Sequence, residues 1–225
     1  MRVWLPDRPG ALGAVAGRIG AVRGDVVGID ILETGDGVAV DELVVRLPQA
    51  SLVDLLVHEV QEVDGVSVED VVAVGAACRD PRLDALETAA VICAADTIDD
   101  LLGALVVHGG HTLGAEWAAV VALSGGGGVR AASGSAPAAA WLTAFVAGAR
   151  AGGEDRPDVG GADMAWAPLP GVDLALVVGR SGTPFRAKER RQVAALARVA
   201  GTRAEEVGPA RSRQDHPSTR TRTIG

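Results

Sequence analysis

Few folds accommodate the order of elements that the first 74 residues predict. Alternating and β-branched apolar segments predict four strands, at 2–5, 26–32, 38–47 and 66–74. Apolar residues at three- and four-residue steps predict two helices, one after the first strand and one after the third. The apolar face of the first helix is formed by Leu12, Val15, Ile19 and Val22, and that of the second by Leu52, Leu55, Leu56, Val60 and Val63. The order β-α-β-β-α-β is typical of a ferredoxin-like fold, with one antiparallel sheet and two helices on one face.

Turn and helix-cap residues mark the boundaries of the elements in this first unit. Thr34–Gly37 (TGDG) predicts the hairpin turn between the second and third strands. Asp7 is expected to cap the first helix, and Ser51 with Asp54 predicts a capping-box-like start for the second.

The rest of the chain predicts a second unit after a linker at 76–82. Residues 83–203 contain two helical patterns, a strand hairpin, a helix, a long Gly/Asp loop, another hairpin and a final helix. From 204 to 225 apolar residues are scarce and arginines frequent, which favours a disordered basic tail. The predicted domains are therefore 1–75 and 83–203, and the expected fold class is α+β.

Charge and composition narrow the classes of partner. The net charge is −8, and the first 75 residues carry 13 acidic side chains against 5 arginines. This balance argues against a surface that follows nucleic-acid phosphates. No window is apolar for long enough to span a membrane, and the N-terminus does not resemble a signal peptide. Two cysteines, Cys78 and Cys93, without CxxC spacing favour reduced thiols, so a cytoplasmic protein without nucleic-acid or membrane partners is expected.

The opening stretch VWLPDRPGALGAVAGRIGAVRGDVVGIDI resembles the start of an ACT domain, and the likeness extends to about residue 74. It combines a short strand, a D-x-P-G-x-L turn, a helix and a strand that ends in an acidic segment. The resemblance implies a small regulatory module that pairs with a second copy and binds a small ligand, often an amino acid. The ligand-binding residues expected from it are Asp7, Arg8, Pro9, Gly10, Ala11, Leu12, Ile29 and Asp30.

Elementary chemistry is consistent with such a site at the turn. Gly10 lacks a Cβ atom, so a ligand carboxylate has room to approach the backbone amides at the start of the first helix. Asp30, on the next strand, is a candidate partner for an ammonium group. The alternative is that Pro9-Gly10 is only a turn and that Asp30 faces solvent.

The second unit resembles a GAF domain over about residues 80–201, most clearly in the stretch TPFRAKERRQVAALARVAG. This family is an α/β sandwich with an antiparallel sheet, and it senses small molecules or serves as a dimerising scaffold. The sequence identifies no ligand for this unit. The charged residues Arg186, Lys188, Arg190 and Arg191 favour a solvated helix face.

No set of residues predicts catalysis or a metal site. His108 and His111 have a spacing that can hold a metal, but two glycines between them favour a loop and no third ligand is near in sequence. No catalytic residues, metal or cofactor are therefore expected. The expected function is that of a non-enzymatic sensor of a small metabolite, acting as a homodimer. The alternatives are a structural dimerisation module and an enzyme with an unrecognised site in the second unit.

One expectation concerns the beginning of the chain. The first strand is short for a ferredoxin-like fold, and an upstream start codon would supply further strand residues.

Overall fold

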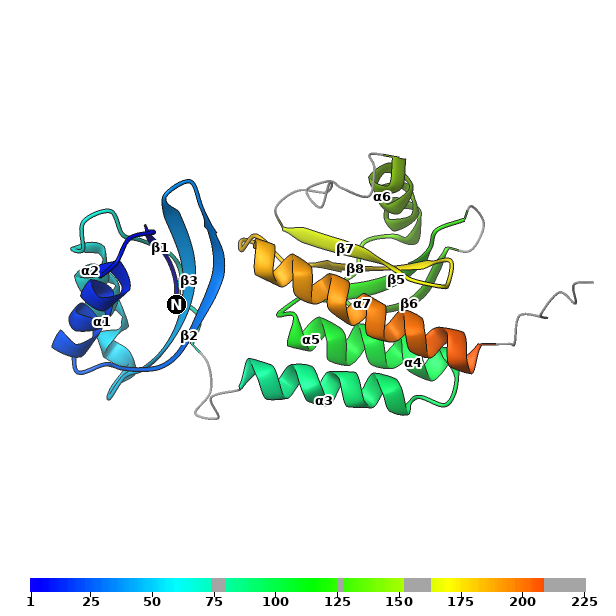
Figure 1. Ribbon diagram of the computed structural model, residues 1–225, viewed down its shortest axis with the longest axis horizontal. Coiled ribbons are helices and arrows are strands. Elements are labelled where there is room, and N and C mark those ends of the chain that lie inside the picture. The colour runs from blue at the N-terminus through cyan, green and yellow to red at the C-terminus, as the bar shows by residue number, and fades with distance from the viewer. Residues whose placement is uncertain (74–79, 125–127, 152–162, 209–225) are drawn as a thin grey trace, which may run out of the picture.

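The computed structural model describes residues 1–73, 80–124, 128–151 and 163–208. Within these residues the chain forms two four-stranded antiparallel sheets, each with its own helices (Figure 1). Separate sets of buried apolar side chains lie under the helices of each sheet. The α+β fold class predicted from the sequence is confirmed.

The first sheet has the predicted β-α-β-β-α-β order. Its strands lie in the spatial order β2-β3-β1-β4, and both helices cover the same face (Figure 1). Neighbouring strands are antiparallel throughout, as in the ferredoxin-like plan. The elements are β1 (Arg2–Pro6), α1 (Ala11–Ala21), β2 (Asp25–Gly35), β3 (Val38–Arg46), the short 3-10 helix η1 (Ala50–Leu52), α2 (Val53–Gln61) and β4 (Ser67–Asp70).

Side chains along each strand point alternately to the two faces of this sheet, and the two faces differ. Val3 and Leu5 of β1 point into the core beneath α1 and α2, where they meet Val15 and Ile19. The intervening side chains of Arg2 and Trp4 therefore point to the opposite face, which carries no helix of the first unit. We call this second face the open face.

Both predicted helix caps are wrong. The residue before α1 is Gly10, and the amide of Asp7 instead donates to the carbonyl of Gly37 at 2.9 Å, so Asp7 closes the strand end and not the helix. Ser51 lies inside η1, and its hydroxyl donates to the side chain of Gln49.

The outer strands differ in length from the prediction. β4 ends at Asp70 because it pairs only with β1, and a register shift at the start of β1 ends the ladder. β2 is longer than predicted because its pairing with β3 continues to the hairpin turn, where Asp36 and Gly37 both have positive φ.

The second sheet has the order β6-β5-β8-β7 and helices on both faces. Figure 1 shows α6 on one side and α3, α4, α5 and α7 on the other. The core under α7 and α3 includes Leu101, Leu176 and Val193, and a smaller one under α6 includes Leu142 and Val146. The elements are α3 (Pro81–Ala94), α4 (Ile98–Ala104), the π-helix η2 (Leu105–Gly109), α5 (Gly110–Thr112), β5 (Trp117–Ala122), β6 (Val129–Gly134), α6 (Ala139–Ala151), β7 (Met164–Leu169), β8 (Leu174–Gly179) and α7 (Ala187–Val207).

The two histidines predicted to lie in a loop belong to a helical segment. His108 is in η2 and His111 is in α5. A Cβ atom on Gly109 would lie 2.8 Å from the Leu196 side chain of α7, so the glycines allow this segment to pack closely and do not end it.

The boundaries of the second unit also differ from the prediction. Asp80 caps α3 by accepting from the amide of Arg82 at 2.9 Å, so the helix begins within the predicted linker. α7 extends to Val207, and Ala204, the first residue of the predicted tail, is buried in the core. Most of the predicted linker and tail, at 76–79 and 209–225, lies outside the described residues. In the described parts, no helix is both long and apolar enough to cross a membrane.

Candidate functional site

The turn between β1 and α1 forms an open surface in front of a helix N-terminus. Gly10 has a φ of 90°, and a Cβ atom built on it would have no neighbour within 4 Å. The amide of Arg8 donates to the Pro6 carbonyl at 2.8 Å, and that of Ala11 donates to the Arg8 carbonyl at 3.3 Å. Pro9 has no amide hydrogen, so of the amides from Arg8 to Leu12 those of Gly10 and Leu12 are left to meet a ligand.

The structure does not bring all the predicted ligand residues to one surface. Asp7 to Leu12 lie together in the turn and the first residues of α1. Asp30 of β2 pairs in register with Glu42 of β3, which itself pairs with Arg2, so Asp30 points to the open face. Ile29 is in register with the core residue Leu43 and points to the helix-covered face, where half of it is exposed. Asp30 is thus on the other side of the sheet from α1.

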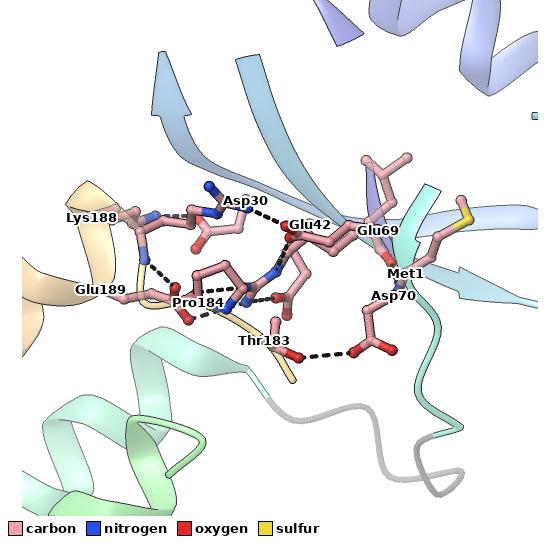
Figure 2. Close-up of polar contacts among 12 residues, drawn as sticks. Met1, Asp30, Glu42, Glu69, Asp70, Thr183, Pro184, Lys188 and Glu189 are labelled. Atoms are coloured by element: carbon pink, nitrogen blue, oxygen red, sulfur yellow. Dashed lines mark hydrogen bonds and ion pairs between the residues drawn. The ribbon is translucent and has the colours of Figure 1, made fainter. Parts of the chain in front are cut away.

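The carboxylate of Asp30 has a partner from the second unit. It accepts a hydrogen bond from the Lys188 ammonium group at the start of α7 (Figure 2). Lys188 is one of several residues near this end of α7 that contact the open face. We call them, with their partners, the α7 cluster: Arg2, Asp30, Glu33, Glu42, Glu69, Arg180, Arg186, Lys188 and Glu189.

Glu189 is the centre of the α7 cluster. Its Oε1 atom lies 2.7 Å from Arg180 of the same unit and 3.1 Å from Arg2 of the first unit. Its Oε2 atom accepts from the amide of Arg186 at 2.8 Å and so caps the first turn of α7. Arg2 also donates to Glu42 at 2.9 Å and to the Pro184 carbonyl at 3.1 Å. One buried carboxylate therefore caps a helix and joins the two units.

Arg186 extends these contacts across the open face. Its guanidinium group lies 4.5 Å from the centre of the Trp4 ring and forms an ion pair with Glu69. A second ion pair, with Glu33 of β2, has a distance of 3.6 Å. Cation–π and charge contacts together hold the start of α7 on the first sheet.

Sequence reasoning missed the α7 cluster. Arg186 and Lys188 were expected on a solvated face, yet Arg186 is largely buried and both contact acids of the first unit. The excess of acids in the first 75 residues, set against these cations, was the available signal. Their pairing could not be inferred because the partners are more than 100 residues apart.

A second buried acid lies on the helix-covered face of the first sheet. Asp41 of β3 is 3% exposed, and its Oδ1 atom accepts no hydrogen bond. Burial raises the pKa of this carboxyl group above its ordinary value, and the nearby charges of Asp7 and Asp30 raise it further. Nothing in the sequence distinguishes Asp41 from the other acids of the hairpin.

The two histidines contribute to an open depression between α3 and the η2–α5 segment. Its volume is about 530 Å³, and it is lined by Asp84, Glu87, Thr88, Ala90, Val91, His108, His111 and Thr112. Among the described residues, no group of three or more His, Cys, Asp or Glu side chains is placed to hold a metal ion.

Comparisons with known proteins find similar chains among solved structures. No family model matches the chain, and no curated protein matches it. Among solved structures, the GAF domain from an Acinetobacter phosphoenolpyruvate-protein phosphotransferase is similar, with a TM-score of 0.42 and 16% sequence identity. The match covers 59% of this chain and 99% of that domain. At this level of similarity the match says nothing about ligand, activity or partner.

Proposed function

We propose that the chain is a non-enzymatic regulatory protein that binds a small carboxylate-bearing metabolite, an amino acid, at the β1–α1 turn of an ACT-like unit. The observation that supports this most is the conformation of Gly10. Its positive φ turns the chain so that the start of α1 opens onto free space. Amides at a helix N-terminus favour an anion, through hydrogen bonds and through the helix dipole.

The α7 cluster supports a route from this turn to a GAF-like second unit. The amide of Asp7 anchors the turn to Gly37 in the β2–β3 hairpin. The same hairpin carries Asp30, which pairs with Lys188 of α7. A ligand that shifts the hairpin therefore changes contacts at the start of α7, whose other residues form much of the second core. The proposed readout is a change in the second unit. The proposed location is the cytoplasm, because two cysteines without CxxC spacing favour reduced thiols.

A thermal-shift screen of the standard amino acids on the purified protein tests ligand binding. A ligand that binds only the folded chain raises the melting temperature by mass action. We expect Gly10→Val to lower the affinity for any such ligand by tenfold or more, because the new methyl groups fill the open space before α1.

Gly128→Val is the matched control. Gly128 also has positive φ and open space around its Cβ position, but it lies in the second unit. Both variants place a β-branched residue at positive φ, and only Gly10→Val should lose binding. Equal affinity in wild type and in a folded Gly10→Val protein would contradict the proposed site.

A structural dimerisation module is the second candidate, and the edge strand β2 supports it. β2 is 11 residues long, it lies at the edge of its sheet, and Ile29 and Ile31 are both half exposed on it. A dimer that binds none of the screened amino acids would favour this function over the sensor.

A further inference from the structure

Asp41 differs from the other buried charged groups in lacking a partner. In the described parts of the chain, the other two buried charged residues are Arg2 and Glu189, which form an ion pair with each other. A buried carboxylate without donors is costly, because desolvation is not offset by new hydrogen bonds. The cost is offset either by a proton on the carboxyl group or by a cationic group that binds there.

The strand register places Asp41 on the helix-covered face of the first sheet. Asp41 pairs with Val3 on one side and with Ile31 on the other, and Val3 belongs to the core under α1 and α2. Two residues along β3, Ala39 packs in the same core as Ala11, the first residue of α1. Asp41 therefore lies on the same face of the sheet as α1, two residues along β3 from Ala39.

The line of cross-strand neighbours that contains Asp41 also reaches the protein surface. Ile31, its neighbour on the edge strand β2, is 53% exposed. At the turn, the charge of Asp7 is close enough to act on the Asp41 carboxyl group. Asp7 of the turn and the buried Asp41 carboxyl group are therefore electrostatically coupled.

We propose that Asp41 receives the ammonium group of an amino acid whose carboxylate lies at the amides of Gly10 and Leu12. This inference rests on the proposed function and names the residue that distinguishes an amino acid from a simple carboxylate. Asp30 does not fill this role, because it points to the open face and pairs with Lys188. The ligand class is a zwitterion with an ammonium group near its carboxylate.

The test compares amino acids with the same molecules lacking the amino group. The probes are the standard amino acids that bind the wild type and their des-amino counterparts, such as propanoate for alanine and 3-phenylpropanoate for phenylalanine. We expect the wild type to prefer the amino acid by tenfold or more, and Asp41→Asn to lose this preference while it keeps binding the carboxylate. Asp30→Asn is the control and should retain the preference.

A further readout separates a ligand contact from a structural role. If Asp41 contributes only to folding, Asp41→Asn lowers the melting temperature of the ligand-free protein. If it is held for a ligand, the ligand-free variant is at least as stable as the wild type although it binds amino acids less well. Asp41→Ser repeats the comparison if circular dichroism shows that the Asn variant is misfolded.

The outcomes separate this inference from the proposed function. A wild type that binds no amino acid contradicts both. If Asp41→Asn keeps the preference for the amino acid and Gly10→Val still weakens binding, Asp41 holds only a proton. That result overturns this inference but not the proposed function. Loss of the preference in Asp30→Asn and not in Asp41→Asn assigns the ammonium group to the open face and also overturns it.

Discussion

At the scale of single residues, the carboxyl group of Asp41 makes the free energy of unfolding depend on pH. Burial raises its pKa in the folded protein, so the folded state holds this proton more tightly than the unfolded state does. Between the ordinary aspartate pKa of about 3.9 and the raised value, the unfolded state binds fewer protons. In that window the contribution of Asp41 to stability therefore falls as the pH rises.

We expect Asp41→Asn to be more stable than the wild type at pH 7, by about 1 kcal/mol or more, because it removes a buried charge without a donor. The difference should shrink as the pH falls and vanish below the ordinary aspartate pKa, where both proteins are neutral at this position. Urea unfolding over a pH series measures it. Asp36→Asn, at an exposed position in the hairpin turn, is the control and should show no such trend. A constant difference at all pH values would contradict the assignment to Asp41.

At the scale of elements, the first turn of α7 depends on the first sheet. Glu189 caps the helix and pairs with Arg2 and Arg180, so its loss leaves two arginines without this carboxylate. The Arg2 and Glu189 side chains are only 6% and 10% exposed. Removal of one member of a buried pair typically costs about 3–5 kcal/mol.

A double-mutant cycle of Arg2→Met and Glu189→Gln measures this pairing. We expect Glu189→Gln alone to lower the free energy of unfolding by about 3 kcal/mol, and the pair to couple by more than about 1 kcal/mol. Arg18 and Glu59 provide the matched control, since they lie at 3.0 Å on the surface of the first unit with side chains 45% and 26% exposed. Their coupling should stay within about 0.2–1 kcal/mol. Equal coupling in the two cycles would mean that the α7 cluster does not hold the units together.

The same elements show what local sequence patterns predict and what they miss. The apolar periodicity of α1 and the β-branched segments of β2 and β3 predicted the first sheet, because one buried face imposes these repeats. The caps were wrong because Gly10 replaces a side-chain cap with a left-handed turn. Arg2 and Glu189 are far apart in sequence, so no periodicity reports their contact. Asp41 differs from its neighbours only in its surroundings, which exist once β1, β3 and α1 have packed.

At the scale of the whole molecule, the α7 cluster neutralises charge on the edge strand β2. β2 carries Asp30 and Glu33 on the open face, where Lys188 and Arg186 neutralise them. Two copies that pair through β2 would otherwise bring unpaired acids together across the twofold axis. The second unit thus makes the edge of the first suitable for self-association. The outer backbone groups of β2 have no strand partner in the described sheet, which favours pairing with a second copy.

We therefore expect a homodimer that pairs through β2, and we expect Ile31→Lys to convert it to a monomer in sedimentation velocity at micromolar concentration. A charge at this half-exposed position would be desolvated when a second strand packs beside it. Two control variants place the same charge elsewhere: Val72→Lys beyond β4 at the opposite edge of the sheet, and Leu86→Lys on the exposed face of α3. Both should remain dimeric. Dissociation caused by Leu86→Lys alone would place the interface on the second unit, and a monomeric wild type would contradict the prediction outright.

Lys188→Met should weaken the dimer without touching β2, because Asp30 then carries an uncompensated charge beside the interface.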